Sequence, residues 1–391
     1  MNTGISLYTL SYNIKLLYLG ETHDTMPIYM DIHQVPGIEA IDLAEAHRKD
    51  MLIQGEFQCK SMTYWLDIER GVAFCLIEAP DKSFVEEMHR KSHGLVPNKI
   101  IEVKNELVES FLGRINDPED AQITDTGLKV FSGTASRILM VTQITDPVLL
   151  RYKLGTGKAV ELMDSLKNSM RKAISVNKGR VAEETGNTHI AAFSSATMAL
   201  ACAIEIRKNL PDNIRTLAGC TMGLHAGEPV ADSDKLFGDT IRLARYLCTL
   251  TSDNGIVISS EVKEMLGRDT GQPDQGHYLT LSPQDENRIK ALYTVLEARW
   301  QDPDFDVPDF CRALAMSYSG LYRKTMTLWK LPPNLLLKEF RLDKARELLK
   351  RQSGNISQTT FDAGFTSPSY FTKCFKRRFG LLPAKYLAAQ A

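Results

Sequence analysis

The chain has 391 residues, of which 43% are hydrophobic, 24% charged and 8% aromatic, and this composition is that of a globular protein. It excludes collagen-like, disordered and disulfide-framework proteins, and no uninterrupted apolar run reaches the roughly 18 residues that a membrane-spanning helix needs. The net charge of −1 hides an asymmetry, because the segment from Phe310 to the C-terminus has 15 Lys and Arg against 4 Asp and Glu, a net +11, and therefore favours a polyanionic partner.

Residues 1–25 do not fit the pattern of the rest. Their apolar run from Ile5 to Leu19 is interrupted by Lys15 and lacks the basic start of a secretory signal. We expect a loosely attached extension, or a natural start at Met26. The seven cysteines form no C-x-x-C pair, which indicates reduced thiols and a cytoplasmic protein.

Residues 26–113 alternate between strand and helix patterns in the order βαββαβ, which predicts a ferredoxin-like sandwich of one sheet and two helices. Gly94 marks the end of the second helix. The expected strands are Ile28–His33, Phe57–Asp67, Val72–Ala79 and Lys99–Val103, and the expected helices are Ile38–Gln54 and Ser83–His93.

Residues 114–134 are polar and have the composition of a linker. Residues 135–300 then form a second α+β unit, with a hairpin turn at Gly186-Asn187. The expected strands are Ile138–Thr142, Arg180–Glu184, His189–Phe193, Thr216–His225, Gly255–Ser259 and Ala291–Leu296, and the expected helices are Gly157–Val176, Ser195–Asn209 and Phe237–Leu250.

Residues 301–391 have an entirely helical pattern, broken at Pro332-Pro333, Gly354 and Pro383. Two helix-turn-helix units joined by one long helix would place two recognition helices about one DNA turn apart. The expected helices are Pro308–Ala315, Ser319–Leu328, Leu335–Arg351, Ile356–Ala363 and Pro368–Phe379.

This last segment resembles the DNA-binding domain of AraC-type transcription regulators in "MSYSGLYRK" (316–324), "RLDKARELL" (341–349) and "GFTSPSYFTKCFKRRFGLLPAKY" (364–386). It departs from the family at Gln358-Thr359-Thr360 and at Trp329-Lys330. The resemblance implies double-stranded DNA as partner. The residues expected to contact phosphates and bases are Ser317, Ser319, Arg323, Lys324, Ser367, Ser369, Tyr370, Lys373 and Arg377.

The middle unit resembles class III nucleotide cyclases in "RILMVTQIT" (137–145), "GRVAEETGNTHIAAF" (179–193) and "FGDTIRLARYL" (237–247). In that family two carboxylates hold two metal ions, but here their positions are Gln143 and Asn187, and a neutral amide supplies no negative charge for a hard cation. The family's ribose-orienting Asn and transition-state Arg correspond to Arg242 and Tyr246. We therefore expect no catalytic residues. The domain either keeps only the fold and pairs with another copy, or retains a small-ligand site.

The first domain resembles a small nickel-binding protein family in "MPIYMDIH" (26–33), "AFCLIEAPD" (73–81) and "MHRKSHG" (88–94). Imidazole and thiolate suit nickel or another divalent transition metal, and two His four residues apart on a helix share one face. A His before Gly94 is equally typical of an ordinary helix C-terminus. The candidate ligands are His33, His47, Cys75, His89 and His93, and Asp50 lies three residues after His47 on the first helix.

These patterns predict a multidomain α+β protein with a ferredoxin-like domain, a class III cyclase-like α+β domain and an all-α double helix-turn-helix domain. Its expected function is sequence-specific transcription regulation, with front domains that sense a metal or a small molecule. A homodimer is expected, because such families self-associate and DNA half-sites favour dimers. Two alternatives remain open: a nucleotide cyclase fused to a DNA-binding domain, and a metal-binding stress protein tethered to DNA.

Overall fold

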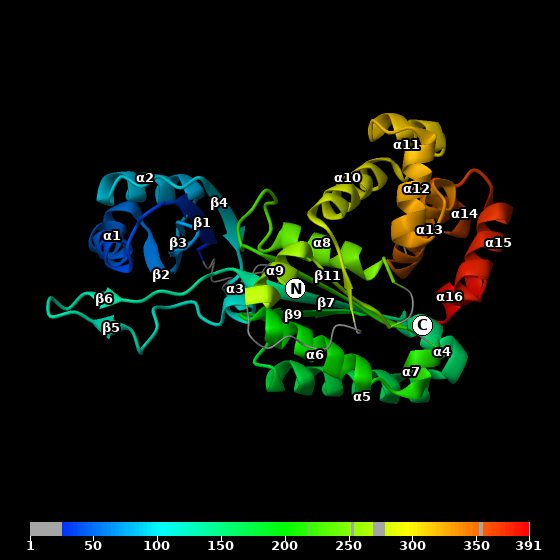
Figure 1. Ribbon diagram of the computed structural model, residues 1–391, viewed down its shortest axis with the longest axis horizontal. Helices are drawn as coiled ribbons and strands as arrows, with labels where there is room; N and C mark the ends of the chain where they lie inside the picture. Colours follow the sequence, from blue (N-terminus) through cyan, green and yellow to red (C-terminus); the bar gives the residue numbers. More distant parts are fainter. Residues whose placement is uncertain (1–25, 218, 252–253, 269–277, 352–354, 391) are drawn as a thin grey trace, which may run out of the picture.

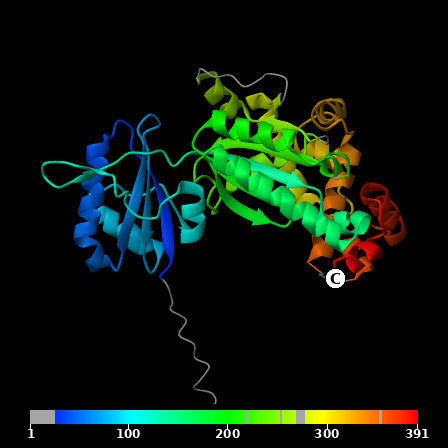
Figure 2. The same ribbon diagram turned by 90° about the horizontal axis from the view of Figure 1, so that it is seen from below.

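The structure is a computed structural model that describes residues 26–217, 219–251, 254–268, 278–351 and 355–390. The extension expected at residues 1–25 and the break expected at Gly354 lie outside the described residues. Figures 1 and 2 show the first domain at one end, the second α+β unit in the middle and the helical domain at the opposite end. Among the described residues, no helix has the length and apolarity needed to cross a bilayer.

The first domain has the expected βαββαβ order, and its four strands form an antiparallel sheet in the order β2-β3-β1-β4. Helices α1 and α2 cover one face of this sheet, and helix α3 with the middle domain covers the other. The ferredoxin-like prediction is confirmed. Its elements are β1 (Ile28–Gln34), α1 (Ala40–Ile53), η1 (Gln54–Phe57), β2 (Lys60–Asp67), β3 (Val72–Glu78), α2 (Lys82–Ser92), β4 (Lys99–Val103) and α3 (Asn105–Leu112).

The segment after α3, which has linker composition, contains a short hairpin of β5 (Gln122–Ile123) and β6 (Lys129–Val130). The ring of Phe131 stacks on Tyr64 with centroids 4.1 Å apart, and the Tyr64 hydroxyl donates to the Phe131 carbonyl over 3.1 Å. Leu128 is buried in the same cluster. Two apolar side chains among many polar ones thus hold part of this segment against the first domain.

The middle domain is built on a six-stranded sheet in the order β12-β11-β10-β7-β9-β8. Helices α5, α6 and α9 cover one face, while α8 packs on β10 and β7 of the other. Contact between α8 and β10 is close, since a Cβ at Gly223 would collide with the Ala244 carbonyl oxygen. The elements are β7 (Arg137–Ile144), α4 (Pro147–Leu154), α5 (Thr156–Val176), β8 (Arg180–Thr185), β9 (Thr188–Phe193), α6 (Ala196–Lys208), α7 (Asp212–Leu217), β10 (Cys220–Gly227), α8 (Gly238–Cys248), β11 (Ile256–Ile258), α9 (Ser260–Arg268) and β12 (Leu279–Thr280).

The strand expected at Ala291–Leu296 is wrong, because these residues lie inside helix α10 (Pro283–Arg299). The Ser282 side chain caps the helix by accepting from the Asp285 amide, and Pro283 occupies the first turn. The buried residues recur at helical spacing: Ile289, Leu292, Tyr293 and Leu296. The expected strand Thr216–His225 is also too long, since Asp212–Leu217 is helix α7 and β10 begins at Cys220.

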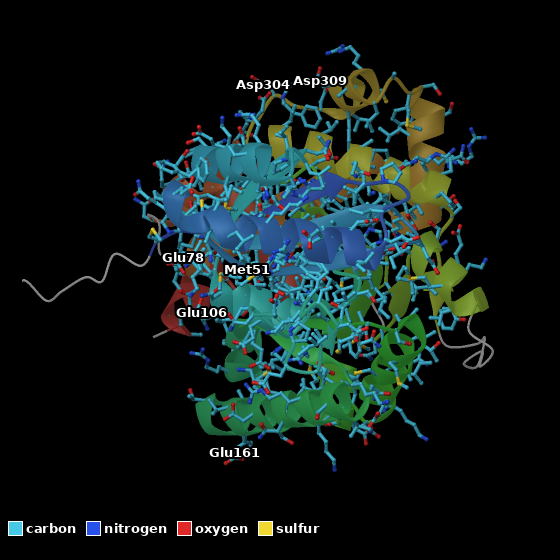
Figure 3. The ribbon with its side chains drawn as sticks, turned by 90° about the vertical axis from the view of Figure 1, so that its left-hand side faces the viewer. Met51, Glu78, Glu106, Glu161, Asp304 and Asp309 are labelled. Atoms are coloured by element: carbon cyan, nitrogen blue, oxygen red, sulfur yellow. The ribbon has the colours of Figure 1, made fainter. Side chains whose placement is uncertain are left out.

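The helical domain contains two units joined by the long helix α13. Helix α10 packs in one core with the first unit (α11 and α12) and with residues of α8, whereas the core of the second unit (α14 to α16) also contains Val148 and Leu149 of α4. Figure 3 shows Asp309 on α11 and Glu161 on α5 at opposite edges of the molecule. The elements are α11 (Val307–Ala313), α12 (Tyr318–Trp329), α13 (Pro333–Lys350), α14 (Ile356–Asp362), α15 (Pro368–Phe379) and α16 (Pro383–Ala388).

Candidate functional sites

A cluster of metal-ligating side chains lies between the sheet and the helices of the first domain. Asp31 and His33 are two residues apart on β1 and so share a sheet face, and Cys75 on β3 is paired with Asp31. Helix α2 places His89 over them. One donor atom from each of these four buried residues lies within 4.8 Å of the others.

Hydrogen bonds around Asp31 hold this cluster together. His89 Nε2 lies 2.9 Å from Asp31 Oδ2, and the backbone N–H of Cys75 donates to Asp31 Oδ1 over 3.0 Å. His33 Nε2 lies 3.2 Å from Asp31 Oδ1 but forms no hydrogen bond there, and His33 Nδ1 has no partner either. Asp31 is 1% exposed and His89 fully buried, so water does not replace these contacts.

The opposite nitrogen of His89 belongs to a second group of ligating residues. His89 Nδ1 lies 3.2 Å from Asp50 on α1 and 3.0 Å from His93 Nε2. His93 Nε2 is itself 3.2 Å from Asp50. The chain can reverse after His93 because Gly94 adopts φ +80° and donates its N–H to the His89 carbonyl. The ordinary helix-end geometry and the ligand cluster therefore coexist.

The surrounding carboxylates favour the protonated form of His89. Burial alone would lower the pKa of His89, but hydrogen bonds to Asp31 and Asp50 and their negative charges outweigh burial and raise the pKa to about 10. Burial would raise the pKa of Asp31, yet the neighbouring His33 and His89 hold it well below its usual range. Burial, reinforced by Asp31 and Asp50, raises the pKa of the Cys75 thiol.

A small cavity of about 10 Å³, the room for roughly one water molecule or ion, borders both groups. His33, Cys75, Asp50 and His93 line it together with His47. A set of imidazole, thiolate and carboxylate donors beside an unpartnered imidazole fits a borderline divalent ion such as nickel or zinc. The residues present therefore fit a metal.

The structure brings three of the five candidate ligands, His33, Cys75 and His89, into one group, and it places His93 in the second group. His47 belongs to neither group although it lines the cavity beside them, and its Nε2 lies 3.4 Å from Asp117. Sequence reasoning left Asp31 out of the ligand set altogether and singled out Asp50 only as the residue three after His47 on the first helix. The signal for Asp31 was its position two residues before His33 on the same strand face.

The candidate DNA-contacting residues lie on, or immediately before, α12 and α15, the second helices of the two units. Ser317 and Ser367 cap these helices by accepting from the amides of Gly320 (3.1 Å) and Tyr370 (3.3 Å). Ser317 is exposed, Ser367 is half-buried, and Lys324 is likewise half-buried. The remaining candidates are exposed: Ser319, Arg323, Ser369, Tyr370, Lys373 and Arg377.

Two exposed residues of this surface were missed. Tyr318 and Tyr322 are 61% and 42% exposed, and their rings stack one helical turn apart on α12. Flat exposed rings can contact sugars and base methyl groups in a groove. The departures from the AraC-type pattern have structural roles: Trp329 is buried and donates to Thr249 Oγ1 over 3.1 Å, and Thr359 and Thr360 are buried in α14.

The positions for which the sequence resemblance implies cyclase catalytic residues make contacts within the protein. Asn187 Nδ2 donates to the Ile144 carbonyl over 2.8 Å, and Arg242 pairs with Asp239 on its own helix. The Tyr246 hydroxyl donates to Glu297 on α10 over 2.8 Å. Both groups of metal-ligating side chains found in the described part of the chain lie in the first domain.

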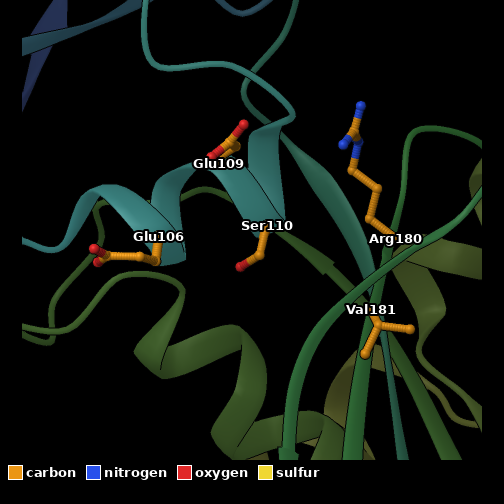
Figure 4. Close-up of a pocket in the computed structure, with 5 residues that line it drawn as sticks. All are labelled: Glu106, Glu109, Ser110, Arg180 and Val181. Carbon is orange, nitrogen blue, oxygen red and sulfur yellow. The ribbon is translucent and has the colours of Figure 1, made fainter.

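An open groove of about 460 Å³ lies between α3 and β8. Figure 4 shows its lining residues, Glu106, Glu109, Ser110, Arg180 and Val181. The Ser110 hydroxyl donates to the Leu107 carbonyl over 2.9 Å, so it is engaged by its own helix.

Two protein families match parts of the chain. Residues 310–389 match the helix-turn-helix domain family, and residues 29–103 match the family of nickel responsive protein SCO4226-like. The DNA-binding domain and the nickel-family domain inferred from the sequence are thereby confirmed.

Curated relatives match only in part. "Histidine kinase P4" of Formosa agariphila is 35% identical over 108 residues, which are 28% of this chain and 8% of that protein. "HTH-type transcriptional regulator GbdR" of Pseudomonas aeruginosa is 23% identical over 150 residues, which are 37% of this chain and 41% of that protein. The chain thus spans less than half the length of either relative.

Solved structures also match parts of the chain. The structure of SCO4226 from Streptomyces coelicolor is 28% identical and covers 19% of this chain and 94% of its own, with a TM-score of 0.19. An adenylate/guanylate cyclase/hydrolase from Silicibacter pomeroyi is 20% identical and covers 36% of this chain and 86% of its own, with a TM-score of 0.30.

Proposed function

We propose that this protein is a sequence-specific DNA-binding transcription regulator whose first domain senses a divalent transition metal. The observation that carries the proposal is the helix-turn-helix match at residues 310–389, with two recognition helices that both present exposed polar side chains. The net +11 of the segment from Phe310 onward supplies the attraction to phosphate that such a domain needs.

Direct readout would come from the exposed side chains of α12 and α15. Arg323 and Lys373 have the length and charge to reach guanine edges in the major groove. Ser317 and Ser367 lie at helix N-termini, where exposed amides favour a DNA phosphate. Tyr370, 53% exposed, supplements these contacts. A homodimer is the proposed DNA-bound form, in keeping with the two-fold symmetry usual for oligomeric regulators.

The sensing proposal relies on the buried ligand cluster and the nickel-responsive family match at residues 29–103. Asp31, His33, Cys75 and His89 would hold the ion. A bound divalent cation would supply positive charge to these buried donors in place of protons. Occupancy would then exchange the hydrogen bonds around His89 for coordination and change how α2 lies on the sheet.

We further propose that the middle domain turns over no nucleotide. Gln143 and Asn187 provide no carboxylate for a divalent ion, and Tyr246 is occupied by its contact with α10. The alternative of a metal-binding protein merely tethered to DNA differs in one measurable respect, because it would bind all sequences alike.

The test is selection of DNA from a random-sequence pool by the full-length protein at fixed salt, with and without Ni²⁺. We expect enrichment of one motif and a change in its affinity when Ni²⁺ is added. The matched variants are Arg323→Ala and Lys373→Ala, with Lys172→Ala on α5 as a control remote from the recognition helices. Uniform recovery of all sequences would favour the tethered protein and overturn the proposal.

A further inference from the structure

A buried carboxylate of the middle domain is held by the second helix-turn-helix unit. Asp146, at the start of α4, is fully buried. Its Oδ2 accepts from the Tyr386 hydroxyl over 2.6 Å and lies 2.9 Å from Lys350 Nζ. Arg346 Nε is 3.6 Å away. A buried carboxylate needs such partners, so this contact fixes α13 and α16 against α4.

Apolar packing continues the same contact. Val148 and Leu149 of α4 belong to one core with Phe371, Phe375 and Tyr386 of the second unit. Asp146 also caps α4, since its Oδ1 accepts from the Val148 amide over 3.0 Å. Asp146, which binds Lys350 and Tyr386, thus directly precedes α4, the helix whose apolar side chains pack in the core of the second unit.

The first unit is attached to the middle domain at a separate point. The ring of Tyr246 on α8 stacks on Tyr293 of α10 with centroids 3.9 Å apart. Thr249 lies 2.7 Å from the Tyr293 hydroxyl and accepts from Trp329 at the end of α12. Leu243 and Leu247 of α8 share the core of this unit.

The two units are consequently bridged twice. Helix α13 joins them directly, with Leu336 in the first core and Leu349 in the second. The middle domain joins them again through Tyr246 at one end and Asp146 at the other. A single helix connection bends and twists, whereas two connections in parallel fix the angle between the parts they join. The exposed faces of α12 and α15 remain uncovered.

We propose that Asp146 is a positioning residue for DNA reading, which sets the placement of the second recognition helix relative to the first through the middle domain. This inference depends on the proposed DNA-binding function. When two recognition helices are held in a fixed arrangement, both bind together only to DNA whose two sub-sites match the distance and angle between the helices. Only such DNA is bound with the higher affinity of the double contact. Asp146 thereby determines the spacing of sub-sites that the protein accepts.

The experiment compares wild type with Asp146→Asn, each as the full-length chain, in selection from a random-sequence pool. Asparagine keeps the α4 cap and removes the charge that holds Lys350. Asp81→Asn is the matched control, because Asp81 caps α2 in the same way, accepting from the Ser83 amide, and is exposed. Tyr386→Phe removes a second partner of Asp146 and leaves its charge in place.

We expect wild type and Asp81→Asn to select two sub-sites at one fixed spacing. Asp146→Asn should select the same sub-sites at several spacings and bind the wild-type site about tenfold more weakly. Tyr386→Phe should shift the spacing in the same direction to a smaller extent. Hydrogen exchange of the free proteins should show faster exchange in α14–α16 for Asp146→Asn, with the first domain unchanged.

If wild type selects a motif with one spacing, and Asp146→Asn selects the same motif and spacing with the same affinity, the inference is overturned. The proposed DNA-binding function would remain intact in that case. Unchanged exchange in α14–α16 would overturn it as well, and this measurement needs no DNA. Failure of wild type to select any motif would instead overturn the proposed function and this inference with it.

Discussion

The phenol rings of Tyr246 and Tyr293 lie almost parallel, 8° apart in orientation, with centroids separated by 3.9 Å. The sequence resemblance to cyclases implies a transition-state arginine at the position of Tyr246, but the ring and the hydroxyl of Tyr246 both face α10. This contact holds α10, which shares a core with the first helix-turn-helix unit, against α8.

The first prediction is therefore that the chain makes no cyclic nucleotide from ATP or GTP with Mg²⁺ or Mn²⁺. Changing Gln143→Asp and Asn187→Asp together should not restore activity, because Arg242 and Tyr246 keep their present contacts. Chromatography of the products, beside an active cyclase as positive control, is the measurement. Turnover by the unmodified protein would contradict it.

The second prediction concerns DNA contacts. Arg323→Ala and Lys373→Ala should each weaken binding to the selected site by about 1–3 kcal/mol and relax preference at the base they contact. Lys172→Ala should leave binding unchanged, since it lies on α5. Titration by fluorescence anisotropy at several salt concentrations measures both effects. Equal losses on specific and random DNA would show phosphate contacts instead of base contacts.

The third prediction concerns the metal cluster. The full-length chain should bind Ni²⁺, and His33→Ala or His89→Ala should lower the Ni²⁺ affinity at least about tenfold. His47→Ala should lower it less, because the imidazole of His47 faces Asp117. Binding should release protons, because the raised pKa of His89, about 10, and the raised pKa of the Cys75 thiol keep both groups protonated at neutral pH. Calorimetry in two buffers of different ionisation enthalpy counts these protons. Metal uptake without proton release would place the ion elsewhere.

The fourth prediction is a pH dependence that belongs to Asp146. Burial would raise the pKa of this carboxyl, but the charge of Lys350 and the hydrogen bond from Tyr386 hold the pKa below its usual range. Stability from the ionised form is therefore complete above the ordinary carboxyl pKa of about 3.9 and is lost as pH falls through the lower folded value. Urea unfolding of wild type and Asp146→Asn should differ at pH 7 and at pH 5, and the difference should shrink near pH 3. A difference that is constant across this range would contradict the prediction.

The fifth prediction follows from helix α10. A DNA-binding fragment that starts at Ser282 keeps the buried residues Ile289, Leu292 and Leu296, whereas one that starts at Asp304 loses them. The shorter fragment should be less stable by at least about 4 kcal/mol, which is roughly the cost of one or two large core truncations. Denaturant unfolding of both fragments decides this, and equal midpoints would show that α10 is dispensable.

Local patterns sufficed for elements with a clear period. The alternation of Ile28–His33 and the caps of α12 and α15 are visible in short windows of sequence. Ala291–Leu296 was misread because six apolar-rich residues have no distinguishing period, and the helix-starting Ser282-Pro283 lies well upstream. Longer windows around short apolar runs would have identified α10.

For the candidate sites, the sequence predicted the His and Cys residues but not the long-range contacts of the buried carboxylates. Histidine and cysteine are conspicuous as ligands wherever they occur, so His33, Cys75 and His89 could be proposed from residue type alone. Asp31 and Asp50 are ordinary acids until strand pairing and helix packing bury them beside His89. The contact of Asp146 with Tyr386 joins residues 240 positions apart, and no local pattern encodes such a distance.

Because the first two domains share an apolar cluster, the first domain cannot be separated from the middle domain without exposing apolar side chains. On the sheet face away from α1 and α2, Trp65, Phe74 and Leu76 belong to one cluster with Phe237 and Ala244 of the middle domain. A fragment cut after residue 113 would expose that face to water, and an open patch of this kind promotes self-association and poor solubility. Dimers formed by such a fragment would be a product of the cut, so oligomeric state has to be measured on the intact chain.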